Sequence, residues 1–241
     1  IQINKGGNMK PVIGIIAKSH TTYTDRTCMC ALDGYRRAVS NCGGVPILIM
    51  PTQDICFEET RPREARKLTE EEKQDLIQQI KLCDGIILPG GNRIYDYDIF
   101  CAKYVLENNI PVLGTCMGMQ LLASIDCGEE RGNILQFIEK EINHNQIPAK
   151  YVHKVKIEKD SKLYEIIGKE EIDVNSRHKY AVTKVNNAKI NAISEDGLIE
   201  GLEFKDKKFA IGVQWHPEDM SLYDENMKKL ILNFIENCKK D

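Results

Sequence analysis

The sequence predicts an α/β fold, a doubly wound and mostly parallel sheet with helices on both faces. Short apolar runs recur through the first half, and they are too apolar for a sheet that has one face in water. Stretches with helical spacing of apolar residues separate these runs, an alternation that is typical of parallel sheets. With 241 residues and 42% apolar side chains, the chain is long enough for one such domain with a full core.

Three strands and three helices are expected before the middle of the chain. The strands are short apolar runs, and the helices have apolar residues three or four positions apart. The expected strands cover residues 10–17, 45–50 and 85–88, and the expected helices cover residues 32–42, 69–83 and 97–107. Thr69 and Glu72 form a capping box at the start of the second helix. Residues 53–66 carry charged side chains with little periodicity, which favours a surface loop.

A sharp turn from strand to helix is expected at Cys116. The apolar run at residues 110–113 predicts a buried strand, and apolar residues from Met119 onward have helical spacing. Gly114 and Gly118 flank the cysteine, where a tight turn leaves no room for side chains. This is the nucleophile-elbow pattern with cysteine in place of serine, and the positive end of the helix dipole favours the reactive thiolate. The alternative is a buried structural cysteine, the commoner role of this residue type.

The second half predicts shorter elements, several of them antiparallel. Residues 127–132 are typical of a turn, and residues 134–147 fit no single type. Strands are expected over residues 151–157, 189–194, 198–204 and 208–213, and helices over residues 161–167 and 227–238. Asp196-Gly197 is a strong hairpin signal between two of these strands.

His216 follows the last expected strand, within the segment Gly212-Val213-Gln214-Trp215-His216-Pro217-Glu218. Pro217 restricts His216 to an extended backbone, and Glu218 can orient the imidazole and stabilise its cation. In this arrangement Cys116 attacks, His216 moves the proton and Glu218 holds the imidazole. The pattern therefore predicts a catalytic triad of these three residues.

The two motifs together resemble the class I glutamine amidotransferase domain. The matching segments are Gly114-Thr115-Cys116-Met117-Gly118-Met119-Gln120 and Gly212-Val213-Gln214-Trp215-His216-Pro217-Glu218. Further segments resemble the γ-glutamyl-γ-aminobutyrate hydrolase branch, the peptidase C26-like group: Pro11-Val12-Ile13-Gly14-Ile15, Val174-Asn175-Ser176-Arg177-His178 and Asp196-Gly197-Leu198-Ile199-Glu200-Gly201. The similarity extends from about Lys10 to the end of the chain. It implies a flavodoxin-like sheet with a small antiparallel strand extension.

The resemblance also implies an oxyanion hole. The backbone N–H groups of Gly91 and Met117 would stabilise the negative charge that develops on the attacked carbonyl oxygen. Without the resemblance, the Gly90-Gly91 pair indicates only a loop. The branch usually has an aspartate shortly after these glycines, whereas this chain has Asn92-Arg93. That departure affects the expected substrate more than the reaction.

Further residues are expected near the substrate. Asn175, Ser176 and His178 match the branch pattern Asn-Ser-x-His-His-Gln, which lines the pocket for the glutamyl group in relatives. The two residues that follow depart from this pattern, and without the resemblance the segment predicts only a polar loop. Gln120, one helical turn after the nucleophile, is a weaker candidate because a polar residue there can also simply face solvent.

The charge distribution argues against nucleic acid or a membrane as a partner. The formal net charge is -3, from 33 basic and 36 acidic residues, and no basic block could follow a phosphate backbone. No apolar stretch approaches the length of a membrane span. Residues 1–8 lack the apolar region of a signal peptide. We expect them to be an expression remnant ahead of a single domain over residues 9–241.

The cysteines predict a reducing, cytoplasmic environment. Their number is nine, which is odd, and Cys28 and Cys30 lack a second pair at metal-ligand spacing. His144 and His153 lie nine residues apart without a metal-binding pattern, so we expect satisfied structural histidines. No metal or organic cofactor is expected.

The expected function is cysteine-dependent hydrolysis of a γ-glutamyl amide bond through a glutamyl-thioester intermediate. The substrate would be a small molecule, either a γ-glutamyl amine or glutamine. One alternative is a glutaminase subunit that supplies ammonia to a separate synthase partner. Another is a non-catalytic protein with a reactive thiol, although such a protein needs no oriented base like His216. The sequence leaves the leaving-group amine and the formation of a homo-oligomer open.

Overall fold

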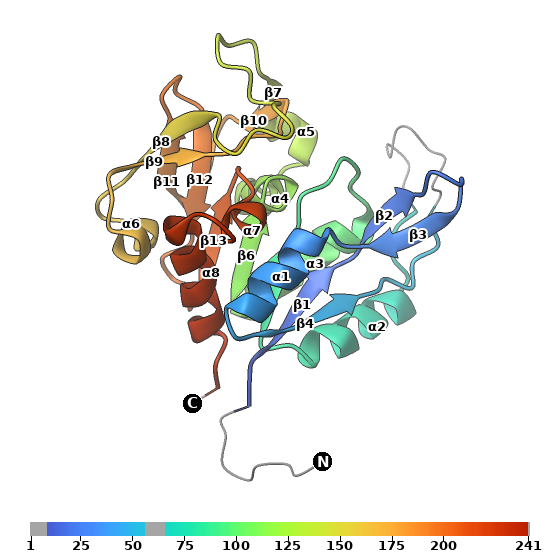
Figure 1. The fold of residues 1–241 in the computed structure, drawn as a ribbon. Helices are drawn as coiled ribbons and strands as arrows, with labels where there is room; N and C mark the ends of the chain where they lie inside the picture. The colour runs from blue at the N-terminus through green and yellow to red at the C-terminus, as the bar shows by residue number, and fades with distance from the viewer. Residues whose placement is uncertain (1–8, 56–65, 241) are drawn as a thin grey trace.

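The computed structural model describes residues 9–55 and 66–240. The expected expression remnant, residues 1–8, lies outside these ranges, as do residues 56–65 of the expected surface loop. The described chain folds around an eleven-stranded mixed sheet flanked by helices, with a separate two-stranded hairpin (Figure 1). The predicted doubly wound α/β class is confirmed.

The parallel half of the sheet contains neighbouring strands from both ends of the chain. In spatial order they are β4 (Val45–Ile49), β1 (Val12–Ile16), β5 (Gly85–Leu88), β6 (Val112–Thr115) and β13 (Ala210–Val213). Every neighbouring pair among them is parallel. The carboxyl ends of β5, β6 and β13 therefore meet at one edge, where open α/β sheets bind ligands.

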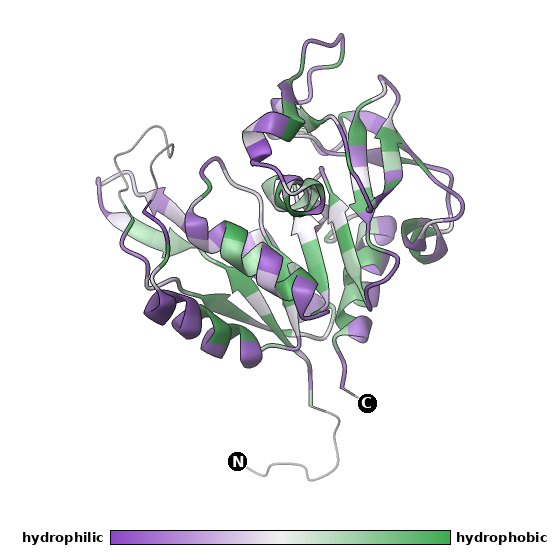
Figure 2. Cartoon of the chain, turned by 180° about the vertical axis from the view of Figure 1, so that it is seen from behind, coloured by the Kyte–Doolittle hydropathy of each residue, from purple (hydrophilic) through white to green (hydrophobic). Residues whose placement is uncertain are grey.

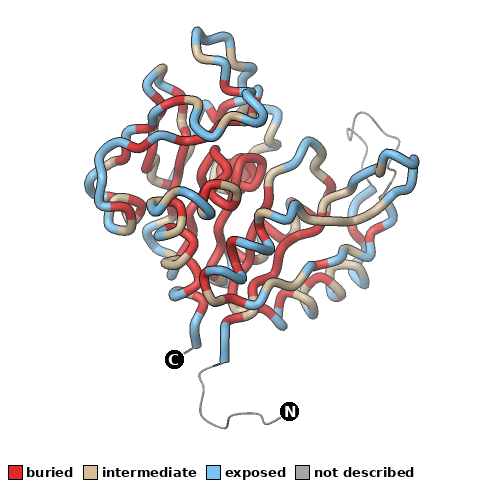
Figure 3. Tube along the Cα trace, in the orientation of Figure 1, coloured by how far each residue is buried: buried red, intermediate tan, exposed pale blue. Residues whose placement is uncertain are grey.

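Helices cover both faces of these strands. One face carries α1 (Asp33–Asn41), α7 (Pro217–Met220) and α8 (Glu225–Asn237), and the other carries α2 (Glu70–Lys81), α3 (Asp96–Glu107) and α4 (Met117–Cys127). Successive strand residues alternate between two cores, so Ile86 packs with α2–α4 and Ile87 packs with α1 and α8. Figure 2 shows the central strands as mostly hydrophobic, and Figure 3 shows them and α4 as buried. Burial on both faces explains the continuous apolar runs.

The antiparallel part continues the same sheet beyond β13. It contains β12 (Ile199–Glu203), β11 (Lys189–Ser194), β8 (His153–Ile157), β9 (Glu171–Val174), β10 (Tyr180–Val182) and β7 (Leu135–Phe137), with α6 (Lys162–Ile167) beside it. β13 is parallel to β6 and antiparallel to β12, so it joins the two parts. The predicted β11–β12 hairpin is confirmed, and its turn contains Gly197 with a φ of 86° that favours glycine.

Some local features differ from the expectations. Residues 18–30, where the sequence predicted no element, contain the antiparallel strands β2 (Lys18–Thr21) and β3 (Thr27–Cys30). The expected turn at residues 127–132 runs into a short helix, α5 (Arg131–Ile134). Short polar strands and single helical turns lack strong hydrophobic periodicity, which explains both differences. Among the described residues, no helix is both long enough and apolar enough to cross a membrane.

Candidate active site

Cys116 occupies the turn between β6 and α4 in a strained backbone conformation. Its φ and ψ are 51° and -106°, a region that residues other than glycine rarely adopt. Strain of this kind costs on the order of 1–3 kcal/mol and persists only where the surrounding structure imposes it. Here the Cys116 N–H donates to the Val213 carbonyl oxygen at 2.8 Å, and the Gln120 N–H donates to the Cys116 carbonyl oxygen at 3.2 Å. The strand and the helix thus hold the turn from both sides.

Glycines let α4 approach the strands closely enough to form this turn. A Cβ at Gly118 would overlap the carbonyl oxygen of Leu88 in β5. A Cβ at Gly114 would lie 2.8 Å from the Gly118 carbonyl carbon, and one at Gly90 would lie 2.8 Å from His216 Cε1. These contacts leave no space for side chains, so the predicted glycines are required by close packing at the turn.

His216 is held by contacts to its side chain and its backbone. Its Nδ1 donates a hydrogen bond to Glu218 Oε1 at 2.7 Å. Its backbone N–H donates to Asn175 Oδ1 at 2.8 Å, and Asn175 Nδ2 donates to its carbonyl oxygen at 3.2 Å. Burial alone would lower the pKa of His216, but the Glu218 charge and hydrogen bonds with Cys116 and Glu218 raise the pKa to about 10. The structure therefore brings together the three side chains of the predicted triad.

Tyr35 also belongs to this site, although the sequence placed it only within the expected helix at residues 32–42. Its hydroxyl lies 2.6 Å from Thr115 Oγ1 and accepts a hydrogen bond from the Gly90 N–H at 2.8 Å. Burial and the nearby charge of Glu218 raise the pKa of Tyr35 well above its usual value. The neutral phenol thus links the elbow to the glycine turn. No sequence signal separates such a residue from its apolar neighbours.

A cavity of about 750 Å³ lies beside Cys116 and His216. Its wall includes the β2–β3 hairpin, the glycine turn after β5 and residues 177–180. Gly91, one of the two expected oxyanion-hole residues, lines the cavity. Met117, the other, begins α4, and a Cβ at Gly91 would lie 3.3 Å from its Cε atom. The two residues are therefore neighbours next to the thiol.

Cationic side chains line much of this cavity. Lys18 pairs with the buried Asp98, and Arg177 pairs with Asp219 at 2.6 Å. Arg131, which the sequence did not indicate, has a neutral partner instead: its Nε donates to the side-chain amide oxygen of Gln120 in α4 at 2.9 Å. The cavity wall therefore suits an anionic group, such as a carboxylate on a substrate.

The expected substrate contacts divide into two groups. Gln120 and His178 line the cavity. The Gln120 Nε2 donates to the Tyr180 carbonyl oxygen and to the side chain of Gln214, each at 3.1 Å. Asn175 and Ser176, by contrast, are 1% and 0% exposed and lie behind the wall. Their side chains bind the backbone of His216 and of His144, so the expectation of direct substrate contacts at these two positions is corrected.

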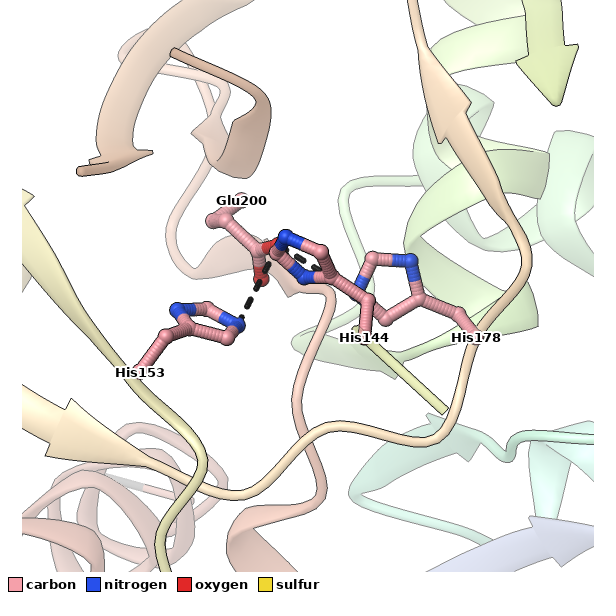
Figure 4. Close-up of side chains that lie close together, drawn as sticks. All are labelled: His144, His153, His178 and Glu200. Atoms are coloured by element: carbon pink, nitrogen blue, oxygen red, sulfur yellow. Dashed lines mark ion pairs between the residues drawn. The ribbon is translucent and has the colours of Figure 1, made fainter. Parts of the chain in front are cut away.

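Four buried residues could together hold a metal ion: His144, His153, His178 and Glu200 (Figure 4). The sequence predicted that His144 and His153 are satisfied structural histidines. For His153 this is wrong, because its Nε2 has no hydrogen-bond partner among the described residues. The residues come from distant segments that only the sheet brings together, so no short sequence pattern could reveal them.

Similarity to known proteins covers most of the chain. The peptidase C26 family model matches residues 95–218, about half of the sequence. A glutamine amidotransferase-like protein of Rickettsia prowazekii is 30% identical over 87% of this chain and 91% of its own length. A subunit of the glutamine-hydrolysing GMP synthase of Archaeoglobus fulgidus is 34% identical over 68% of this chain and 81% of its own length. These matches support a hydrolase domain that acts on C–N amide bonds.

A solved structure shares the fold. The glutaminase domain of Trypanosoma brucei CTP synthase, determined with bound acivicin, matches with a TM-score of 0.62 and 22% identity over 96% of this chain and 95% of that chain. At this identity the likeness concerns the fold, and it agrees with the doubly wound sheet described above. The chain therefore belongs to the peptidase C26 family, within the class I glutamine amidotransferase-like superfamily.

Proposed function

We propose that this chain is a cysteine-dependent hydrolase that cleaves γ-glutamyl amide bonds. The observation that carries the proposal is the elbow cysteine, Cys116, beside an imidazole that Glu218 orients, at the wall of a cavity of about 750 Å³. A nucleophile, a general acid–base and an orienting carboxylate are the groups that amide hydrolysis requires. Membership of the family supports the same reaction class.

The reaction begins when the Cys116 sulfur attacks the side-chain carbonyl carbon of the substrate. The backbone N–H groups of Gly91 and Met117 stabilise the negative charge on the carbonyl oxygen. His216 then gives its proton to the leaving nitrogen, the C–N bond breaks, and a glutamyl thioester remains on the cysteine. His216 next takes a proton from water, which attacks the thioester and releases glutamate. Glu218 keeps the imidazole in place through both steps.

Arg131 is the residue we assign to the α-carboxylate of the glutamyl group. Its guanidinium lines the cavity, and its Nε donates to an uncharged amide rather than to an acid. Lys18 and Arg177 line the same cavity, but each pairs with an aspartate of the protein. An arginine suits a carboxylate because its planar donors can bind both oxygens.

A second candidate function is that of a glutaminase that passes ammonia to a synthase. The similarity to the GMP synthase of Archaeoglobus fulgidus and to the glutaminase domain of a CTP synthase favours it. The same triad would then act on glutamine, and a separate protein would use the ammonia. Glutamine cleavage that increases when a synthase is added would favour this function over a free-standing hydrolase.

The proposal is tested with a panel of γ-glutamyl amides, glutamine included. Released amine is quantified, and mass spectrometry detects a glutamyl adduct on Cys116. Cleavage of γ-glutamyl amines with little use of glutamine supports the free-standing hydrolase, and cleavage of glutamine alone supports the glutaminase. The Cys116→Ala variant is expected to lose turnover, whereas Cys28→Ser, a half-buried cysteine of β3, is the matched control that keeps it. Full activity of Cys116→Ala would end the proposal.

A further inference from the structure

Three histidines and one glutamate from separate segments meet in a buried cluster next to the cavity wall. His144 follows β7, His153 begins β8, His178 lies between β9 and β10, and Glu200 is in β12. Each is at most 5% exposed. Figure 4 shows the three imidazoles gathered around the Glu200 carboxylate. We refer to these four residues as the His-Glu cluster.

One nitrogen of each ring approaches the same carboxylate oxygen. Glu200 Oε1 lies 3.5 Å from His144 Nδ1, 3.7 Å from His153 Nε2 and 3.2 Å from His178 Nε2. The four atoms all lie within 4.8 Å of one another. A tetrahedral zinc ion with bonds of about 2.0–2.1 Å holds its ligand atoms roughly 3.3 Å apart. The three oxygen–nitrogen separations, from 3.2 to 3.7 Å, are close to this value.

The outer nitrogen of each ring has an acceptor. His144 Nε2 lies 3.0 Å from Asp196 Oδ2, His153 Nδ1 lies 3.2 Å from the Lys154 carbonyl oxygen, and His178 Nδ1 lies 3.1 Å from the Tyr180 carbonyl oxygen. An imidazole that donates from one nitrogen presents a lone pair on the other. Metal-binding histidines are oriented in the same way, commonly by a carboxylate or a backbone carbonyl. The inner nitrogens are thus set up to accept a cation.

The inner atoms of the cluster are poorly satisfied. Within the described part of the chain, His153 Nε2, His178 Nε2 and both carboxylate oxygens of Glu200 have no hydrogen-bond partner. The hydroxyl of Ser176 lies 3.4 Å from His144 Nδ1, but it donates to the His144 carbonyl oxygen at 2.7 Å. A buried carboxylate that faces nitrogen lone pairs needs a positive charge between them. A proton on one ring would engage that nitrogen alone, whereas a metal ion would engage all four ligand atoms.

We propose that the His-Glu cluster is a tetrahedral metal site that binds zinc. Imidazole nitrogens suit zinc, whereas magnesium and calcium prefer all-oxygen sites. Four protein ligands leave no open position, which is typical of a structural zinc site rather than a catalytic one. The ion would join the segment around His178 to β8 and β12. Because residues 177–180 line the cavity, zinc would hold this wall in place without taking part in amide cleavage.

Metal analysis of the tag-free, full-length protein tests the site directly. Inductively coupled plasma mass spectrometry is expected to find about one zinc per chain, and cobalt added to the metal-free protein is expected to give the intense visible absorption of a tetrahedral complex. Glu200→Gln and His153→Ala are expected to lose both signals. The control His20→Ala removes a histidine of β2 outside the cluster and is expected to keep them. Cys116→Ser is also expected to keep them, which excludes zinc on the catalytic thiol.

A milder variant protects the test against misfolding. Asp196→Asn leaves all four ligands in place and weakens the acceptor for His144, while the remaining amide oxygen can still accept from the Ser194 hydroxyl. Zinc affinity is therefore expected to fall about 10- to 100-fold while circular dichroism stays unchanged. A folded wild-type chain that takes up neither zinc nor cobalt would overturn the proposal and would assign the cluster to a protonated histidine–glutamate network. Unchanged metal content in Glu200→Gln and His153→Ala would overturn it equally.

Discussion

His216 shows how two neighbouring groups decide the charge of a buried residue. Burial favours the neutral imidazole, but the Glu218 carboxylate and the hydrogen bonds with Cys116 and Glu218 raise its pKa from the usual 6.5 to about 10. A raised pKa favours the protonated imidazole at neutral pH, which is the form that would give a proton to the leaving amine in the proposed reaction. The raised pKa also contributes to the free energy of unfolding. This contribution is fully present below pH 6.5 and is lost as the pH rises towards 10.

The Glu218→Gln variant removes the negative charge of the carboxylate but keeps an oxygen that can accept the hydrogen bond from His216. The amide oxygen can still accept from His216 Nδ1, but the negative charge that raises the pKa of His216 is gone. We expect the alkaline limb of kcat/KM, near pH 10 in the wild type, to move to lower pH in the variant. Activity profiles against pH measure this shift. An alkaline limb at the same pH in both proteins would contradict the assigned role of Glu218.

Asn175→Ala separates a positioning role from a substrate contact. The side chain holds both backbone groups of His216, so its loss is expected to reduce kcat by about 10- to 100-fold through misplacement of the imidazole, with little change in KM. Asn133→Ala, an exposed position in α5, is the control and should keep the wild-type kcat. If KM rises instead while kcat is unchanged, Asn175 contacts the substrate after all.

At the scale of elements, the elbow depends on how closely α4 sits against β5 and β6. Residues from Met117 to Ser124 are all buried, so the helix has no solvent face along most of its length. Gly118 and Gly114 provide the close approach, and Cys116 takes up the strain where the strand ends. The position of the thiol is therefore set by backbone contacts between elements.

Gly118→Ala tests this dependence on close contact. The added methyl group would meet the Leu88 carbonyl oxygen, so α4 must shift, and we expect a loss of about 1–3 kcal/mol in the free energy of unfolding together with reduced activity. Urea denaturation and turnover measure the two effects. Gly132→Ala in α5 has nothing within 4 Å of its new methyl group and should change stability by no more than about 0.5 kcal/mol. Equal stability of the two variants would contradict the packing argument.

At the scale of the whole molecule, β13 unites the parallel and antiparallel parts. It pairs with β6 on one side and with β12 on the other, and it leads directly to Trp215 and His216. Trp215 is fully buried, and its Nε1 lies 3.1 Å from the sulfur of Met227 in α8. Unfolding of either part would remove a neighbour of this strand, so the two parts are expected to unfold together.

Equilibrium unfolding tests whether residues 9–241 form a single domain. Trp215 is the only tryptophan in the sequence, so its fluorescence reports on the region around β13 alone. Far-ultraviolet circular dichroism reports on all the helices and strands. We expect the two signals to follow one coincident transition in urea. Two separated transitions would divide the chain into independent folding units.

Prediction from the sequence succeeded for those elements whose physical cause is a local pattern of residues. Strands β1 and β5 are buried on both faces, so their apolar runs are visible in the sequence, and the capping box at Thr69 and Glu72 forms as expected. Local patterns missed the β2–β3 hairpin because its strands are polar and partly exposed. They also missed Tyr35 and Arg131, whose roles come from neighbours distant in the chain.

By itself the sequence determined the parallel α/β core, the elbow at Cys116 and the pairing of His216 with Glu218, because periodicity, glycine spacing and short separations express these features locally. Only the tertiary structure decided that Cys116 lies beside His216, that Asn175 supports the imidazole from behind the cavity, and that the His-Glu cluster exists. Cys116 and His216 are 100 residues apart, Asn175 and His216 are 41 apart, and the His-Glu cluster comes from four separate segments between residues 144 and 200. Contacts of that range depend on strand order and on which face each side chain occupies, and a single sequence does not encode either in any local pattern.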